Sequence, residues 1–473
     1  MIVRNRRPLF YHRKKSSIYR VFLWFCVILG GIWLINQVNT GSIQRPFQPS
    51  PTPTRSVLSY TKEGDASFAA GQLNKAINSY TEAAAIDPNS LDVWVKLARI
   101  QAYSSNLLTT DAQRWERMKT ALDSINKAVP LAPDDSTVHA MRAFVLDWLW
   151  NATLVAGQDP GTMLNEAEQE ATRALQLDAQ NVLAMAYFSE IMVDQQKWSQ
   201  AEKIIQQAVQ RGPDLMDVHR VYAYVLESTS QYTQAIEEYK KAIQITPNLT
   251  FLYISVGANY RRLAFDSNIT SERNSLYDQA LEYFSMAANL DTQLQIQDPI
   301  PYIAIAKTYS QKGDFFAAAL NMKKALSFDI ANADIHGQLG IIYFKARNYE
   351  GSIPALQCAV RGCSADISCQ ARYGRACNTN EQSAQVAGLP LTSSTVVYYY
   401  TYGSVLAALS IPQRNYCPEA VKVLDEVGTA FSSDATIMGI VNAGQQICAS
   451  LQQEVVQTST PLPTSTPIPT PKP

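Results

Sequence analysis

Residues 182–249 decide the fold, and they read VLAMAYFSEIMVDQQKWSQAEKIIQQAVQRGPDL followed by MDVHRVYAYVLESTSQYTQAIEEYKKAIQITPNL. Each half is 34 residues long and places similar side chains at the same offsets. In the first half these are Met185, Phe188, Ser189, Met192, Trp198, Ala201, Ile205, Ala208 and Pro213, and in the second His219, Tyr222, Ala223, Leu226, Tyr232, Ala235, Tyr239, Ala242 and Pro247. Self-similarity at a fixed period predicts a chain built from repeated structural units.

The spacing within a unit predicts two helices that cross closely. A small residue such as Ala201 or Ala235 lets two helix backbones approach, and the large residues fill the space beside it. Proline at the end of the unit prevents the second helix from continuing. A single helical hairpin of this length cannot bury its apolar face, so each unit must stack on its neighbours.

The same phase continues on both sides, and the pattern resembles the tetratricopeptide repeat. Units begin near Val57, Leu91, Ser136, Val182, Met216, Thr250, Pro299 and Ala333, and a degenerate ninth begins near Val396. The resemblance implies an all-α fold, a solenoid of about 8–9 helical hairpins plus a capping helix over 435–456. Glu63 and Pro354 depart from the family pattern. The additions near 104–111, 151–160 and 266–274 are expected as loops at one edge of the solenoid.

We expect seven segments along the chain. They are a basic cytoplasmic head (1–20), a transmembrane helix acting as a signal anchor (21–38), a Pro-rich linker (39–56), repeats one to eight (57–363), a Cys-containing insertion (364–395), the ninth repeat with the capping helix (396–456), and a disordered Pro/Thr-rich tail (457–473).

The apolar run 21–35 carries no charge, and nine basic side chains but no acidic one lie in the first 56 residues. With its flanks the run approaches the roughly 20 residues needed to cross a bilayer. Most of the basic residues precede the apolar run. This order predicts a cytoplasmic N-terminus and an extracytoplasmic repeat body in a single-pass protein. A removable signal peptide has the same order of segments. The absence of an Ala-x-Ala site favours the anchor, and the short apolar core favours the signal peptide.

Seven cysteines are present. Cys26 lies in the apolar run, and the other six are Cys358, Cys363, Cys369, Cys377, Cys417 and Cys448. An even, clustered set on the exported side favours three disulfides over a zinc site or free thiols. In the tetratricopeptide fold the start of one unit's second helix lies beside the end of the next unit's first helix. The resemblance therefore implies a Cys417–Cys448 disulfide, with the other four cysteines paired in an order left open.

Charge and motifs disfavour two broad function classes. Of 40 basic side chains only 31 follow residue 56, against 41 acidic ones, so the body is a poor binder of nucleic acid. His139, His219 and His336 each hold the fourth position of a unit, where packing residues stand in other units. No nucleophile elbow or phosphate-binding loop is found. The sequence therefore predicts no enzyme, no catalytic or metal-ligating residues and no cofactor.

In the family, the first helices line a concave surface with the second, fifth, ninth, twelfth and thirteenth positions of each unit. Those positions here supply a set of aromatic, apolar and basic residues: Arg99, Tyr103, Phe144, Trp148, Arg220, Tyr224, Phe251, Ile254, Arg261, Arg262, Lys307 and Phe344. Such a set suits a peptide with acidic and apolar side chains. The alternative is that several of these residues pack against neighbouring helices. No Asn occupies a ninth position, so the family's clamp for a partner's terminal carboxylates is absent.

The sequence thus predicts a non-catalytic, membrane-tethered scaffold that presents an extracytoplasmic groove to a protein or peptide partner. The alternatives are an accessory subunit of an envelope enzyme or secretion complex, and a glycan or small-molecule receptor that uses the 364–395 insertion.

Overall fold

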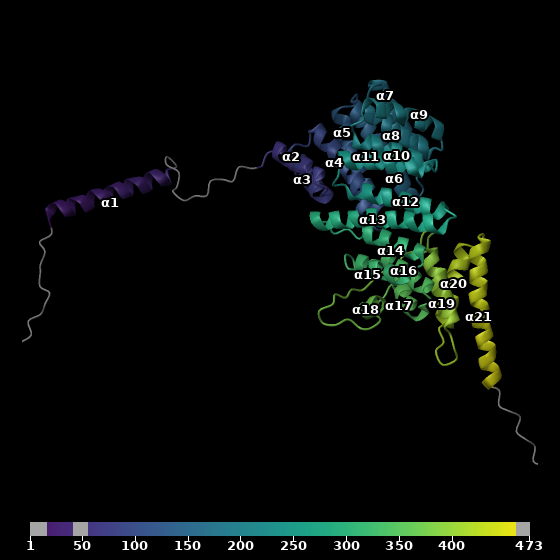
Figure 1. Ribbon diagram of the computed structural model, residues 1–473. Helices are drawn as coiled ribbons and strands as arrows, with labels where there is room; N and C mark the ends of the chain where they lie inside the picture. The colour runs from purple at the N-terminus through teal and green to yellow at the C-terminus, as the bar shows by residue number, and fades with distance from the viewer. Residues whose placement is uncertain (1–16, 41–54, 460–473) are drawn as a thin grey trace, which may run out of the picture. The chain divides into compact units, whose positions relative to one another are not determined.

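The computed structural model describes residues 17–40 and 55–459, and within them the fold is all helical (Figure 1). The chain divides into two compact units, Met1–Arg55 and Ser56–Pro473. In the described ranges the extended pairings are two isolated bridges, Cys363 with Val386 and Ile411 with Arg414. Most of the expected head, linker and tail lies outside the described residues.

The first unit contains helix α1 (Ile18–Asn39). Its stretch Ile18–Val38 has a mean hydropathy of 2.1 and none of it is buried, so its length and composition suit a membrane span. A signal sequence near an N-terminus meets the same criteria. The helix begins slightly earlier than the expected segment 21–38.

The second unit holds nine consecutive helical hairpins within its described residues. They are α2 (Val57–Ala69) with α3 (Leu73–Ile86), α4 (Leu91–Ser104) with α5 (Asp111–Ala128), α6 (Ser136–Val155) with α7 (Met163–Leu177), α8 (Val182–Asp194) with α9 (Trp198–Arg211), α10 (Met216–Ser228) with α11 (Tyr232–Ile245), α12 (Thr250–Asp266) with α13 (Thr270–Leu294), α14 (Ile300–Lys312) with α15 (Phe315–Leu326), α16 (Ala333–Lys345) with α17 (Tyr349–Val360), and α19 (Val396–Ala408) with α20 (Cys417–Ala430). Short 3₁₀ turns, η1 (Ser105–Leu107) and η2 (Val129–Leu131), follow α4 and α5, and the last helix, α21 (Ala435–Ser459), packs on α19 and α20.

The fourth residue of several units joins that unit to the end of the preceding one. Trp94 donates a hydrogen bond to the carbonyl of Pro88 at 2.8 Å, and Tyr253 donates to that of Pro247 at 2.9 Å. His139, His219 and His336 bond in the same way to the carbonyls of Pro133, Pro213 and Ile330, at 2.8, 2.7 and 3.0 Å. The three histidines therefore hold one structural slot in three separate units.

The hairpins wind tightly enough for distant units to touch. The Asn248 amide, between α11 and α12, donates to the carbonyl of Ala69 at 2.8 Å, and the Gln72 amide donates to that of Leu294 at 3.3 Å. The segment after α4 meets a later unit, because the Asn332 amide donates to the Thr109 hydroxyl at 2.7 Å. Stacking thus closes one superhelical turn on itself.

Several segments that we expected to be irregular contain helix, and in the addition near 266–274 helix α13 begins at Thr270. The insertion 364–395 forms α18 (Ala365–Tyr373), on which Cys369 is buried, although we expected a segment held only by disulfides. The addition near 151–160 begins as a continuation of α6 rather than as a loop, and α21 runs to Ser459, past the expected start of the tail. In both helices the chain continues a helix that is already packed, which spares the cost of a new nucleus.

Three disulfides use the six cysteines of the body. They join Cys358 to Cys363, Cys369 to Cys377, and Cys417 to Cys448. The third links the start of α20 to α21. The free cysteine of the described residues, Cys26, is exposed on α1.

Candidate functional site

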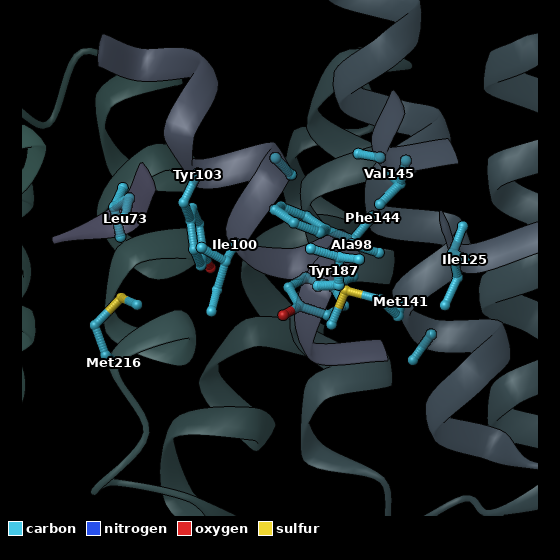
Figure 2. Close-up of a cluster of buried hydrophobic side chains, with 14 of the residues drawn as sticks. Leu73, Ala98, Ile100, Tyr103, Ile125, Met141, Phe144, Val145, Tyr187 and Met216 are labelled. Atoms are coloured by element: carbon cyan, nitrogen blue, oxygen red, sulfur yellow. The ribbon is translucent and has the colours of Figure 1, made fainter. Parts of the chain in front are cut away.

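The inner face of the superhelix is occupied by aromatic side chains from first helices. We call Tyr103, Phe144, Trp148, Tyr187 and Phe251 the central cluster. Phe144 lies 4.6 Å from Tyr187, 4.9 Å from Trp148 and 5.5 Å from Tyr103 between ring centroids, and Tyr103 stacks on Phe251 at 5.4 Å. Figure 2 shows Tyr103, Phe144 and Tyr187 among buried apolar neighbours. Helices α4, α6, α8 and α12 therefore meet inside one turn.

Asp217, on α10, joins this cluster to the opposite wall. The Arg99 guanidinium forms an ion pair with its carboxylate, and the Tyr103 hydroxyl donates to it. The Tyr187 hydroxyl donates to the same oxygen at 2.9 Å. Burial alone would raise the pKa of Asp217, but Arg99, the Tyr103 hydroxyl and Arg220 hold it below its usual value. One buried carboxylate thus connects α4, α8 and α10.

Arg220 is neutralised in the same interior. Its guanidinium donates to both oxygens of Glu190 at 2.8 and 2.7 Å, and the Trp148 indole donates to Glu190 at 3.0 Å. The guanidinium also lies 5.3 Å from the ring centre of Trp148 and 5.6 Å from that of Phe144. Such a planar cation satisfies carboxylate and aromatic neighbours together.

The structure therefore brings together only part of the groove residues that the sequence predicts. Six of its members, Arg99, Tyr103, Phe144, Trp148, Arg220 and Phe251, lie in or against the central cluster. Tyr103 and Phe144 are buried, because first helices from different units meet across the narrow turn. Arg261 lies elsewhere, with its guanidinium 5.5 Å from the ring centre of Phe284 and its pKa lowered by burial. Several residues of the set thus pack against neighbouring helices, which is the alternative that the sequence left open.

A pocket of about 490 Å³ remains beside the central cluster, and we call it the inner pocket. It is lined from η1 and α5, through α6, α8, α10, α11 and α12, to the start of α14. Its lining includes the side chains Asp111, Arg114, Asp147, Trp148, Asn151, Glu190, Asp194, Arg220, Tyr224, Tyr239, Phe251, Ile254 and Asp298. Residues of two additions that we expected as edge loops, near 104–111 and 151–160, thus form part of its wall.

Several carboxyl groups of the inner pocket are held in unusual protonation states. Burial and the neighbouring Asp194 and Glu190 raise the pKa of Asp147 well above its usual value. Burial raises the pKa of Asp194 to about 6, although its carboxylate accepts the Tyr224 hydroxyl at 2.6 Å. Burial likewise raises the pKa of Asp298 to about 7. The pocket is therefore acidic but incompletely ionised at neutral pH.

The sequence analysis did not identify the acidic residues of this site. Asp217, Glu190, Asp147 and Asp194 hold the second, ninth, twelfth and thirteenth positions of their units, the positions that supplied the basic and aromatic set. Reading every residue at those positions, rather than only the basic and aromatic ones, would have found them. No group of three or more His, Cys, Asp or Glu side chains in the described residues is arranged to hold a metal ion.

A superhelix of stacked helical hairpins with a pocket on its inner face defines an α-solenoid of the interaction-module class. Family models agree: one described as "TPR repeat" matches residues 64–102, and one described as "Tetratricopeptide repeat" matches 192–249. The chain is a tetratricopeptide-repeat protein, a family of generally non-catalytic scaffolds.

Two curated relatives match part of the chain. The first, "Interferon-induced protein with tetratricopeptide repeats 2" of Cricetulus griseus, is 22% identical over 211 residues, 42% of each chain. The second, "Protein IFIT1 homolog B" of Homo sapiens, is 20% identical over 245 residues, 50% of each. The chain thus spans half or less of the length of the curated relatives it matches.

Solved structures are similar to this chain at low identity. A human IFIT1 dimer with PPP-AAAA is 14% identical, with 87% of this chain and 92% of that chain covered and a TM-score of 0.45. Yeast Tom70 is 13% identical, with 64% and 85% covered and a TM-score of 0.34.

Proposed function

We propose that this chain is a non-catalytic, membrane-tethered scaffold that binds a segment of a protein partner in the inner pocket, on the extracytoplasmic side of a membrane. The observation that carries the proposal is the pocket itself, because six successive repeats contribute to its wall. Concave sites of a few hundred Å³ with aromatic walls and a few polar groups are typical of ligand-binding sites.

A protein partner fits the chemistry of this pocket better than a nucleic acid. The lining holds five carboxyl side chains and two arginines. Arg220 is paired with Glu190, and Arg114 lies 3.0 Å from Asp111, so neither arginine is available to a phosphate. Nucleic-acid binding depends on clustered, accessible cations. The acidic wall therefore supports a partner other than RNA or DNA.

The membrane tether is supported by α1 and by the cysteines. An apolar helix preceded by basic residues favours an N-terminus that stays cytoplasmic. Three disulfides in the body suit an oxidising compartment.

Topology can be tested by protease digestion of sealed vesicles from cells that express the full chain. In inside-out vesicles we expect the 55–459 body to be protected, and in right-side-out vesicles to be degraded. The reverse pattern would contradict the extracytoplasmic assignment, and recovery of the body in the soluble fraction would contradict the tether.

Use of the inner pocket can be tested by site-specific photo-crosslinking in native membranes. Asn151 is exposed and lines the pocket, whereas Asn165 is equally exposed on α7 outside it. With p-benzoylphenylalanine in place of Asn151, we expect an adduct to a specific protein, and with the same probe in place of Asn165, none. Equal crosslinking at both positions, or none at Asn151, would contradict partner binding in the pocket.

A further inference from the structure

The charged groups of the inner pocket do not balance one another. Within the described residues, its two arginines are each paired with one of its carboxylates. Asp147, Asp194 and Asp298 form no ion pair with a cation in that part of the chain. Three buried or half-buried carboxyl groups thus line one cavity, and none of them is paired with a cation in the described residues.

Asp147 supplies an independent sign of a missing ligand. Its side chain is 1% exposed, it lines the inner pocket, and its Oδ1 has no hydrogen-bond partner within the described structure. Its carboxyl group also interacts with that of Asp194, which in turn accepts the Tyr224 hydroxyl. A buried acceptor without a donor costs about 1–3 kcal/mol, so native proteins usually satisfy it. Within the described residues nothing bonds to this oxygen, which leaves it open to a donor from a ligand.

The aromatic wall is suited to a cation as well. Arg220 already shows how a guanidinium sits in this interior, bonded to a carboxylate and 5.3 Å from the Trp148 ring centre. Phe251, Tyr224 and Tyr239 line the same cavity. Aromatic faces attract ammonium and guanidinium groups, most strongly where water is excluded.

A metal ion fits the pocket less well than an organic cation. No group of three potential ligands is close enough to hold a metal in the described residues. Yet the cavity of about 490 Å³ is large enough for an extended side chain.

We infer that the inner pocket binds an organic cation, the guanidinium or ammonium group of a basic side chain on the partner, with Asp194 and Asp298 as its counter-charges and Asp147 as a hydrogen-bond acceptor. The inference rests on the proposed function and adds the chemistry of the partner. It replaces the acidic peptide expected from the sequence with a basic one. A free amine carries the same group, so the test must separate the two sources.

The test is a calorimetric titration of the full chain in lipid nanodiscs at pH 7.5. The probes are a blocked pentapeptide with one central arginine, the same peptide with neutral citrulline, and agmatine as a free guanidinium compound. We expect the arginine peptide to bind at least tenfold more tightly than the citrulline peptide. If agmatine binds as tightly as the arginine peptide, the site is assigned to a free amine, and binding of an organic cation is still supported. Equal binding of the arginine and citrulline peptides, or binding of no probe, overturns the inference.

Variants test the assigned counter-charges. Asp194→Asn and Asp298→Asn keep the side-chain shape and remove the charge. Each should weaken binding of the arginine peptide at least tenfold. Asp123→Asn, at an exposed position of α5 outside the pocket, should leave it unchanged. Wild-type affinity in both pocket variants overturns the inference. If a variant fails to fold, as judged by circular dichroism, the comparison of the arginine and citrulline peptides on the wild-type chain still tests the inference.

Failure of this inference can be told apart from failure of the proposed function. An adduct at Asn151 that persists in Asp194→Asn and Asp298→Asn, with equal binding of the arginine and citrulline peptides, overturns the cation and leaves the scaffold in place. Absence of the Asn151 adduct in an otherwise wild-type chain overturns the proposed scaffold function. The peptide titration still decides whether the pocket binds a cation.

Discussion

His336 holds the fourth position of the eighth unit, and its side chain is wholly buried. Its Nε2 bonds to the carbonyl of Ile330 at 3.0 Å, and its Nδ1 has no partner within the described structure. Burial lowers the pKa of His336 to about 4, so the ring is neutral in the folded chain at physiological pH. An unfolded histidine titrates near 6.5. Protons therefore bind to the unfolded state first, and this residue makes folding less favourable as the pH falls from about 6.5 to 4.

We expect His336→Tyr to remove that pH dependence, because Tyr253 fills the same slot with its hydroxyl on the carbonyl of Pro247. Relative to the wild type, the free energy of unfolding of the variant should rise by about 3 kcal/mol between pH 7 and pH 4. Urea unfolding at a series of pH values measures this difference.

His219→Tyr is the matched control and has the opposite sign. The Glu238 carboxylate, at 2.6 Å, raises the pKa of His219. This histidine contributes stability that is fully present below its unfolded pKa and is lost as the pH rises through its folded pKa. The relative stability of His219→Tyr should therefore fall, not rise, as the pH decreases. The same trend in both variants would contradict the assignment.

At the scale of a helix pair, the crossing depends on a small residue at the eighth position of the unit. Gly257 on α12 faces Phe284 of α13, and a Cβ placed on this glycine would lie 2.5 Å from the ring. The same position is Gly64 in the first unit, against Tyr80. We expect Gly257→Ala to lower the free energy of unfolding by about 1–3 kcal/mol through overpacking.

Gly439→Ala on α21 is the control, because nothing lies within 4 Å of its Cβ position. This change should be neutral or stabilise by up to about 1 kcal/mol, since alanine favours the helix. Thermal unfolding of both variants measures the contrast. A Gly257→Ala chain that melts with the wild type would mean that Phe284 moves aside without cost.

The helix α21 is held to the last hairpin by a covalent link as well as by packing. The Cys417–Cys448 disulfide spans 31 residues of sequence, whereas Cys369–Cys377 spans 8. Because closing a longer loop removes more entropy from the unfolded chain, Cys417→Ser with Cys448→Ser should cost about 3–4 kcal/mol. Cys369→Ser with Cys377→Ser should cost about 1 kcal/mol less. Chemical unfolding of both double variants tests the order, and a larger loss for the shorter loop would contradict it.

Across the whole molecule, Asp217 ties together units that are far apart in sequence. It accepts from Arg99 and Tyr103 on α4 and from Tyr187 on α8. Breaking a buried ion pair on one side leaves an unpaired charge and costs about 3–5 kcal/mol. We expect this loss for Asp217→Leu, and a smaller loss for Asp217→Leu combined with Arg99→Met, because the orphaned cation is then gone.

The partly exposed pair Lys96 and Asp65, at 3.1 Å, provides the control for that cycle. Lys96→Met should change the free energy of unfolding by less than about 1 kcal/mol. Urea unfolding of the wild type and these three variants gives the values. A double variant that is less stable than Asp217→Leu alone would contradict the assigned pairing.

The sequence predicted the fold because stacking of neighbours leaves a local signature. The spacing of Ala201, Ala235 and their large neighbours identified the repeats, and the all-helical hairpin solenoid is confirmed. The site was harder to predict, because its contacts depend on how tightly the solenoid winds. Arg99 meets Asp217 only because one turn brings the second unit against the fifth. A repeat period does not specify that winding, so the sequence could not decide which groove residues pack against neighbouring helices.

The contact between Asn248 and Ala69 has a consequence for how the chain comes apart. In an open array each repeat feels only its neighbours, so the ends fray and repeats can be trimmed or added one at a time. Here the first hairpin is bonded to the fifth and sixth, so its loss breaks contacts inside the superhelical turn. The first six hairpins should therefore unfold in one step. Deleting the first hairpin should destabilise α13 near Leu294, some two hundred residues away.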